Sequence, residues 1–548
     1  MKKFIFRLKS SFDKMTIRRQ ENTGKYKATN VILMLLFPLF IITTSEIIQM
    51  KNPSNFVGFL FERPGVVLFS VILVSVIYAI LILAFKKIYI ATTAVGIALT
   101  TLSIVELFKF NTSGNHLILT DMKMAVNVGN LTKFAYIKIT PQLVIMVLIV
   151  LAYLATVYWF NPVVKPGLKK RITSASVCVA SLATMFLAPS VAMPVYSFFS
   201  IDTTDTSNVF KLNEKFTNNN LIAFLAQTTT EFLSKKVKQP EVYDSETVTA
   251  LLEQADTSNG DFKKPNVIVI MSEAFADFRR FEDKIDVDSS VYESFDRIRS
   301  QGYSGQAVVP AFGAYTVRTE FELQFGLPVR SLNDPNMPQR LLLDRPQDTI
   351  PSYFKKLGYN TNYIHTFYRN FYSRARVFKN YGFDNLYFDD NMLIPTEYYR
   401  SYISDEVIFD QMEKMMKETD EPVYIHTTTM QNHQPYDSPD MTQLEYYFQG
   451  VEKMLGDLET FINNLNESGE PTVVLFVGDH FPCFKGEESV YNELGITGET
   501  AGSMYVQEYF IWNNFGMDYN EAPKDLVSTF YLPYVVLDLI DAPKSSFV

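Results

Sequence analysis

Five apolar runs of about 20 residues lie within the first 200 positions, and they constrain the fold more than any other feature of this sequence. A helix of about 20 apolar residues crosses a hydrocarbon core roughly 30 Å thick. One such run could be a buried helix of a soluble domain, but five in one third of the chain indicate a membrane bundle. The expected spans are Val31–Ile48, Gly65–Phe85, Ile88–Phe108, Leu143–Phe160 and Ser174–Phe199.

Basic residues predict the orientation of this bundle, because cytoplasmic loops retain Lys and Arg. The tail before the first run is dense in them. The second-to-third connection holds Lys86 and Lys87, and the fourth-to-fifth holds Lys165, Lys169 and two further basic residues. We therefore predict a multi-pass protein of the cell membrane, with a cytoplasmic N-terminus and an extracellular part after Phe199.

Charge separates the chain into two parts. Residues 1–200 contain 21 Lys and Arg against 6 Asp and Glu, whereas residues 201–548 contain 29 against 53. We expect a transmembrane domain at 1–200, a connector at 201–264 and an extracellular domain at 265–548. Within the connector, Leu221–Leu225 is a candidate membrane-surface segment. Cys178 lies in a predicted span and Cys483 in the outer part, so we expect no disulfide.

From Asn266 onward, short β-branched or aromatic runs alternate with amphipathic stretches, which is typical of an α/β domain with a largely parallel sheet. In such sheets ligands bind beyond the carboxyl ends of the strands. The predicted strands are Val267–Met271, Gln306–Val309, Asn362–His365, Val423–Thr427, Val473–Val477 and Glu508–Trp512. The predicted helices are Val291–Arg299, Thr349–Leu357, Ser404–Lys417 and Leu444–Asn464.

Metal-ligating side chains follow two of these strands directly. Glu273 comes after the first, and Asp479 and His480 follow the Val473–Val477 strand. Carboxylate oxygens with one imidazole suit a hard divalent cation. Either strand end alone is more often a simple polar terminus, but the two together favour a metal site.

A hydroxyl group begins another predicted helix. Thr316 follows a turn that contains Gly313, and the free amides of a helix N-terminus favour anions such as phosphate. With a cation nearby, this hydroxyl could act as a nucleophile. The alternative is that Thr316 only caps the helix. Thr319, one turn further along, is expected to point away from the metal-bearing strand ends.

Four of the five histidines, including His365 and His433, lie in the outer part near predicted strand ends. Shortly after His365 comes a basic and aromatic cluster that includes Tyr372 and Arg374. A guanidinium group matches the geometry of phosphate oxygens. A solvated helix face with aromatic packing would give the same pattern.

In their order and spacing, these residues resemble the lipoteichoic acid synthases and related glycerol phosphate transferases of the alkaline phosphatase and sulfatase superfamily. Thr316 precedes Glu320 and Phe321 as the family's nucleophile does. His433 stands in an Asn-His-x-Pro segment, and Phe371–Arg374 is similar to an element that holds glycerol phosphate, with His365 shortly before it.

The resemblance implies a five-span bundle that carries an extracellular sulfatase-like α/β domain. It further implies that one divalent cation is bound by Glu273, Thr316, Asp479 and His480, with Thr316 as the nucleophile. His433, Arg374, Tyr372 and His365 would bind substrate. One imidazole among oxygen ligands leans towards Mn²⁺ rather than Mg²⁺.

The implied reaction moves glycerol phosphate from phosphatidylglycerol, through a covalent intermediate on threonine, to a lipoteichoic acid chain, a glycolipid primer or a cell-surface glycan. Membrane lipid is an expected partner, and nucleic acid is not. Two departures leave donor and acceptor open: Tyr372 stands where the best known synthases have Trp, and Tyr315 where they have Lys. Phosphoethanolamine transfer, or another headgroup transfer or hydrolysis, is the nearest alternative, and an inactive headgroup-binding surface protein is the alternative outside enzymes.

A sulfatase activity is disfavoured. It needs a Cys or Ser in a Cys-x-Pro-x-Arg setting, and neither Cys178 nor Cys483 is followed by that pattern.

Overall fold

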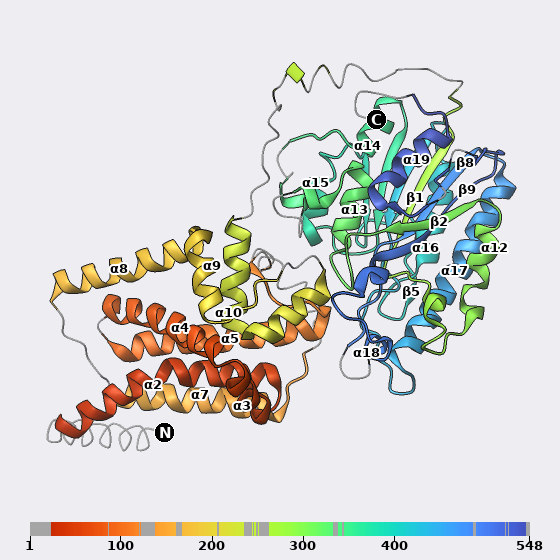
Figure 1. Cartoon of the computed structure of the whole chain (residues 1–548). Helices are drawn as coiled ribbons and strands as arrows, with labels where there is room; N and C mark the ends of the chain where they lie inside the picture. Colours follow the sequence, from red (N-terminus) through yellow and green to blue (C-terminus); the bar gives the residue numbers. More distant parts are fainter. Residues whose placement is uncertain are drawn as a thin grey trace, which may run out of the picture.

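The computed structural model describes residues 23–85, 87–119, 121, 137–160, 167–204, 208–234, 244, 246–247, 250, 262–332, 338–341, 345–485, 489–520, 522–523 and 525–543. The helices of the first 200 residues pack together, and a separate α/β domain follows them (Figure 1).

Four helices in the described N-terminal part are long and apolar enough to cross a membrane, or five when a bent pair is counted as one span. The fifth predicted span is that pair, in which α8 and α9 meet at Ala188 with a bend of 93°. Pro189 opens α9, and its ring and missing N–H are incompatible with an uninterrupted helix through this point. The helices are α2 (Thr23–Met50), α3 (Pro53–Glu62), α4 (Pro64–Phe85), α5 (Ile88–Ser113), α7 (Pro141–Phe160), α8 (Leu168–Leu187) and α9 (Pro189–Phe198).

The connector contributes to the packing of the bundle. Its helix α10 (Val209–Ser234) is kinked at Asn220, whose φ of 58° lies in the left-handed region. The segment that was a candidate for the membrane surface is mostly buried in protein instead, with Leu221 and Phe224 fully enclosed. The Leu221 amide donates to Glu46 of α2, and the Asn220 side chain bonds Ser70 of α4.

An eight-stranded sheet forms the centre of the α/β domain, in the order β10-β2-β9-β8-β1-β7-β3-β4. The strands from β8 to β4 run parallel, as predicted, and β9 is antiparallel to both of its neighbours. The strands are β1 (Asn266–Ser272), β2 (Tyr303–Val308), β3 (Asn360–His365), β4 (Asn385–Phe388), β7 (Val423–Thr428), β8 (Thr472–Gly478), β9 (Val506–Asn513) and β10 (Val527–Ser528). A separate hairpin joins β5 (Tyr398–Tyr399) and β6 (Tyr402–Ile403).

Alternate residues of each central strand face two cores. Ile268 and Ile270 of β1 belong to the core that α12 (Glu293–Arg299), α16 (Asp405–Lys417) and α17 (Gln443–Ser468) cover. Val267 and Val269 face the opposite core, under α13 (Thr316–Phe325), α14 (Ile350–Lys356) and α19 (Leu532–Leu539). With both faces covered, the site residues are held at the edge where the strands end. The short helices α15 (Arg374–Val377) and α18 (Val490–Leu494) lie in connections.

Candidate active site

The candidate metal ligands converge because β1 and β8 are parallel neighbours. Ser272 pairs with Gly478, so Glu273 and Asp479 follow at the same edge of the sheet. The approach is close: a Cβ added at Gly478 would lie 2.3 Å from the Phe275 carbonyl oxygen, so only glycine fits there. The chain therefore places two carboxylates side by side.

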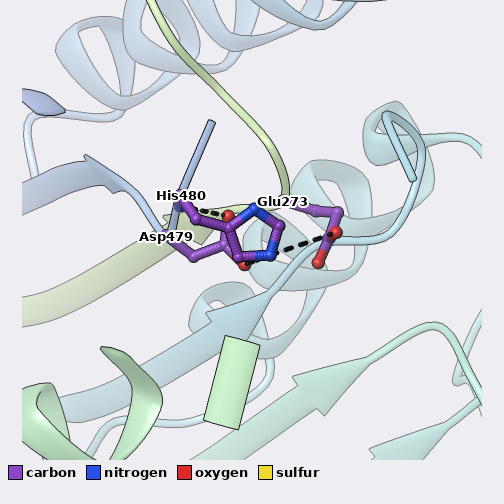
Figure 2. Close-up of side chains that lie close together, drawn as sticks. All are labelled: Glu273, Asp479 and His480. Atoms are coloured by element: carbon purple, nitrogen blue, oxygen red, sulfur yellow. Dashed lines mark hydrogen bonds and ion pairs between the residues drawn. The ribbon is translucent and has the colours of Figure 1, made fainter. Parts of the chain in front are cut away.

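Glu273, Asp479 and His480 form a buried cluster in which one ligand atom from each lies within 4.8 Å of the others (Figure 2). Asp479 Oδ1 accepts from the amides of Ala274 and His480, while Oδ2 is buried without a hydrogen bond and lies 3.2 Å from His480 Nε2. His480 Nδ1 donates to the Phe481 carbonyl, which leaves the Nε2 lone pair directed at the carboxylates. This orphaned carboxylate oxygen and this tautomer fit a divalent cation.

The two carboxylates of the cluster favour the binding of a cation. Burial, and then the charge of Asp479, raise the pKa of Glu273 well above its usual range. Burial raises the pKa of Asp479 as well, although His480 and backbone amides partly oppose this. Two buried carboxylates this close are costly when both are ionised, and a bound cation removes that cost.

The Thr316 hydroxyl belongs to this cluster. Its Oγ1 donates to Glu273 Oε2 at 3.2 Å and lies 3.4 Å from His480 Nε2. Thr316 is the first residue of α13, and the residue before it, Tyr315, makes no side-chain cap. The capping interpretation of Thr316 is therefore wrong, because its hydroxyl points at the metal-ligating side chains.

The expectation for Thr319 is also wrong. Its hydroxyl is fully buried and donates to the Asp479 carbonyl oxygen at 2.8 Å. Thr319 lies one helical turn after Thr316, and at this position its hydroxyl contacts the backbone at Asp479. Thr319 therefore supports the backbone that carries Asp479.

His433 lies on the pocket wall with His480 and Thr316. Its Nδ1 donates to the Gln434 carbonyl oxygen at 2.7 Å and contacts the Tyr402 hydroxyl at 3.1 Å. Burial lowers the pKa of His433 to about 4. The ring is thus neutral at physiological pH, with its proton on Nδ1.

Arg374 and His365 meet in a buried network on the other side of the pocket. Arg374 Nε donates to both carboxylate oxygens of Glu320, at 3.1 and 3.2 Å, and Nη1 donates to His365 Nε2 at 3.1 Å. His365 Nδ1 donates to the Thr428 carbonyl oxygen. Burial and then Arg374 hold the pKa of His365 well below its usual range. The guanidinium is an internal ion pair and not the solvated helix face of the alternative interpretation.

Tyr372 completes the wall. Its ring lies under the Arg374 guanidinium, with 5.3 Å between the guanidinium carbon and the ring centroid, and its φ of 55° is left-handed. The pocket is small, with a cavity volume of about 60 Å³. All eight residues singled out from the sequence either line it or, in the case of Asp479, lie directly behind it: Glu273, Thr316, His365, Tyr372, Arg374, His433, Asp479 and His480.

Sequence reasoning missed Glu320, which it used only as a marker for the nucleophile. This fully buried carboxylate also accepts from the hydroxyls of Tyr363 and Thr428, at 2.6 and 2.7 Å. A Glu four residues after Thr316 lies one helical turn deeper, and that spacing was the available signal. His426, in contrast, is enclosed within β7 and does not line the pocket.

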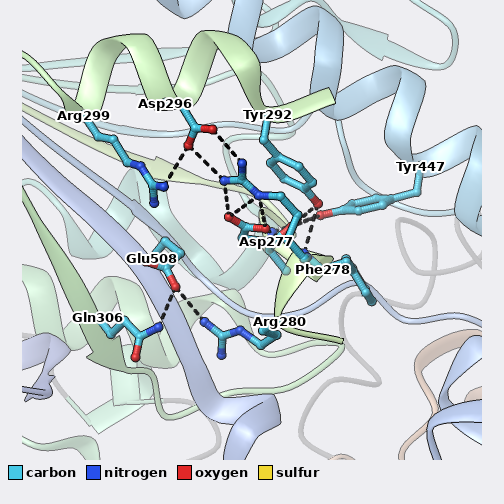
Figure 3. A network of polar contacts seen from close by, with 11 residues as sticks. Asp277, Phe278, Arg280, Tyr292, Asp296, Arg299, Gln306, Tyr447 and Glu508 are labelled. Carbon is cyan, nitrogen blue, oxygen red and sulfur yellow. Dashed lines mark hydrogen bonds and ion pairs between the residues drawn. The ribbon is translucent and has the colours of Figure 1, made fainter. Parts of the chain in front are cut away.

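The loop that carries Glu273 away from β1 is firmly braced. Arg279 pairs with Asp277 and Asp296, while the Tyr292 hydroxyl donates to the Ala276 carbonyl oxygen (Figure 3). The neighbouring Arg280 pairs with Glu508 of β9. These contacts tie the loop to α12 and to the sheet, so Glu273 is held in place by structure outside the pocket.

Comparison with known families agrees with this geometry. The Sulfatase family model matches residues 265–542, the α/β domain with its complete site. The chain belongs to the Sulfatase family. This is the domain of the alkaline phosphatase superfamily that the sequence predicted.

Curated relatives resemble the chain over its second half. A putative cyclic beta-1,2-glucan modification protein of Rhizobium meliloti is 26% identical over 304 residues, which cover 50% of this chain and 45% of that protein. A lipoteichoic acid synthase of Staphylococcus saprophyticus is 26% identical over 262 residues, or 43% of this chain and 38% of that protein. The chain thus spans less than half the length of these relatives.

The whole architecture has a solved counterpart. The integral membrane protein lipooligosaccharide phosphoethanolamine transferase A of Neisseria meningitidis superposes with a TM-score of 0.56 over 93% of this chain and 95% of that one, at 13% identity. At this identity the likeness concerns the fold alone. A helical membrane part followed by a sulfatase-like α/β domain is therefore a shared architecture.

Proposed function

We propose that this Sulfatase-family protein is a membrane-bound, metal-dependent phosphotransferase that moves glycerol phosphate from phosphatidylglycerol to an acceptor hydroxyl. The observation that carries the proposal is the Thr316 hydroxyl, 3.2 Å from Glu273 and 3.4 Å from His480 at the edge of the sheet. A hydroxyl beside a cation site is the arrangement that a phosphoryl-transferring nucleophile needs.

Glu273, Thr316, Asp479 and His480 would hold the cation, with Mn²⁺ favoured over Mg²⁺ because of the imidazole. When bound, the cation supplies positive charge that lowers the pKa of the Thr316 hydroxyl and neutralises charge on the phosphate. The ligand residues are already oriented by backbone hydrogen bonds, so little rearrangement accompanies binding.

In the first step Thr316 Oγ1 forms a bond to phosphorus, the bond between phosphorus and the diacylglycerol oxygen breaks, and diacylglycerol leaves with a proton. In the second, an acceptor hydroxyl attacks the glycerol phosphate on Thr316 and restores the threonine. His433, on the pocket wall, is the candidate to receive the acceptor's proton. Arg374 and Tyr372 orient the phosphate, and His365 fixes the guanidinium.

The expected acceptors are a lipoteichoic acid chain, a glycolipid primer or a cell-surface glycan. The two curated relatives are named for a beta-1,2-glucan and for lipoteichoic acid, and a polymer acceptor is consistent with both names. The proposal keeps the extracellular placement of residues 265–548, with 1–200 as the membrane domain and 201–264 as its connector. A site that opens near the lipid headgroups suits a lipid donor.

The deciding experiment incubates the full chain in vesicles with labelled phosphatidylglycerol and Mn²⁺, without acceptor, and maps the adduct by mass spectrometry. We expect glycerol phosphate on Thr316 and free diacylglycerol, both lost in Thr316→Ala. Thr361→Ala is the matched control, since Thr361 is an equally buried threonine with its own hydrogen bond at the opposite edge of the sheet.

Each other result rejects part of the proposal. If phosphatidylethanolamine gives a phosphoethanolamine adduct and phosphatidylglycerol gives none, the donor is phosphatidylethanolamine and the proposed donor is wrong. An adduct on another residue would overturn the nucleophile. A metal-loaded protein that forms no adduct and releases no product from either lipid would be the inactive headgroup-binding protein.

A further inference from the structure

A side-chain contact joins the membrane domain to the residue that precedes the Thr316 nucleophile. The Tyr315 hydroxyl donates to Asp121 Oδ1 at 2.9 Å, and Asp121 follows α5 in the chain. The other oxygen of this carboxylate, Oδ2, forms an ion pair of 2.9 Å with Lys109 of α5 and accepts a hydrogen bond from the Ile118 amide. Asp121, only 9% exposed, is therefore a rigid acceptor.

The segment between α5 and Asp121 is also packed against the pocket. A Cβ added at Gly114 would lie 3.3 Å from Cys483 Sγ, and one added at Gly313 would lie 3.6 Å from the Ser113 carbonyl oxygen. Both Gly313 and Cys483 line the pocket. Asn213 of α10 donates to the Gly114 carbonyl oxygen and anchors the segment from the other side. Ser113 and Gly114 thus pack against two residues that line the candidate active site.

Tyr315 transmits this contact to Thr316. It immediately precedes the nucleophile, and its φ of 66° lies in the left-handed region, which is strained for a residue with a Cβ. Such a conformation persists only where the surroundings impose it. Here the Asp121 hydrogen bond and the Arg318 guanidinium, 4.4 Å from the ring centroid, hold the side chain.

We propose that Asp121, held by Lys109, is a positioning residue supplied by the membrane domain, which orients the Thr316 nucleophile through Tyr315. The inference rests on the proposed phosphoryl transfer. The position where the best known synthases have Lys is here a tyrosine, and its hydroxyl is the group that this contact uses. The catalytic centre is then shared between the two domains.

A double-mutant cycle on the full chain in vesicles tests the inference. Tyr315→Phe and Asp121→Ala should each lower kcat about tenfold to a hundredfold, because a misplacement of about 1 Å in a reacting group has effects of that size. KM and metal content should change less than about twofold. The double variant should be no slower than the single ones, since both remove the same contact. Asp121→Asn should recover most of the rate, because an amide still bonds the phenol.

Tyr505→Phe is the matched control. The Tyr505 hydroxyl also contacts the membrane-side part of the chain, accepting from the Val209 amide of α10 at 2.9 Å, but it does not line the pocket. We expect its kcat to stay within about twofold of wild type. An equal loss in this variant would mean that any domain contact has the same effect, and would overturn the specific role of Asp121. Additive losses in the cycle, or wild-type kcat in Tyr315→Phe, would also overturn it.

Each variant is measured with phosphatidylglycerol and with bis(p-nitrophenyl) phosphate, a water-soluble phosphodiester that needs the nucleophile but no lipid site. A wild type that cleaves only the soluble ester refutes the proposed donor, and the cycle on that ester still decides the role of Asp121. A loss confined to the lipid would assign Asp121 to lipid binding and overturn its positioning role. A wild type that cleaves neither donor overturns both proposals.

Discussion

The buried pair of Glu320 and Arg374 makes a sharp prediction about stability. Neither side chain is more than 1% exposed, and the pair is joined by two hydrogen bonds of 3.1 and 3.2 Å. Glu320→Gln keeps the shape of the side chain but leaves the Arg374 cation buried without its counter-ion. Removing one partner of a buried pair costs about 3–5 kcal/mol, so we expect the free energy of unfolding to fall by that amount.

A change at Arg374 distinguishes the effect of an unpaired buried charge from a simple loss of packing. Glu320→Gln with Arg374→Met removes the orphaned charge and replaces it with an apolar side chain of similar length. The double variant should therefore be more stable than Glu320→Gln alone. As a control, Asp348→Asn breaks the pair with Lys356, in which both side chains are 69% exposed, and should cost less than about 1 kcal/mol.

Urea unfolding of the full chain in detergent, followed by tryptophan fluorescence, measures these differences. The chain has two tryptophans, so Trp159→Phe leaves the buried Trp512 of β9 as the reporter of the α/β domain. A double variant that is less stable than Glu320→Gln, or a loss below about 1 kcal/mol for Glu320→Gln, would refute the reasoning.

Three further outcomes are expected. Burial raises the pKa of Asp405 from 3.8 to about 7, so the folded state holds a proton that the unfolded state has lost, and stability falls as pH rises from about 4 to 7. Asp405→Asn removes this dependence. In urea titrations its free energy of unfolding, relative to that of wild type, should rise by up to about 3 kcal/mol between pH 5 and pH 8. An equal difference between the two proteins at both pH values would contradict the prediction. Asp479→Ala should lose divalent metal, read by elemental analysis, and activity together, and full metal occupancy would remove Asp479 from the ligands. Protease added to intact cells should digest residues 265–548 and spare the N-terminal tail, and protection of the outer domain would reverse the orientation.

Periodicity and strand-end polarity predicted most of the fold. The central strands β1, β3, β7 and β8 match their predicted ranges within about two residues, because β1 and β8 are continuous apolar runs and β3 and β7 each hold a short β-branched and aromatic stretch. Glu273 and Asp479 could be paired from the sequence because parallel neighbours end at one edge. The antiparallel direction of β9 left no such signal, since most of its residues are buried, as are those of the parallel strand β8.

Long-range contacts explain what the sequence did not predict. Thr316 is a residue type that often caps helices, and only its contact with Glu273 in the structure shows where its hydroxyl points. The contact of Asp121 with Tyr315 joins positions 194 apart in the chain and follows no local pattern. The bend between α8 and α9 had a local signal, Pro189, which a hydropathy window averages away.

The sheet order has a consequence for how the protein is made. β1 lies between β7 and β8, so the first strand of the domain to be synthesised must wait for two that follow it by more than 150 residues. Until the chain beyond residue 480 has emerged, Glu273 has neither its carboxylate neighbour nor its imidazole, and Thr316 has one of its two partners. Folding with such distant pairings is slow compared with local helix formation. A growing or truncated chain can therefore have its helical bundle assembled while its candidate active site is still incomplete.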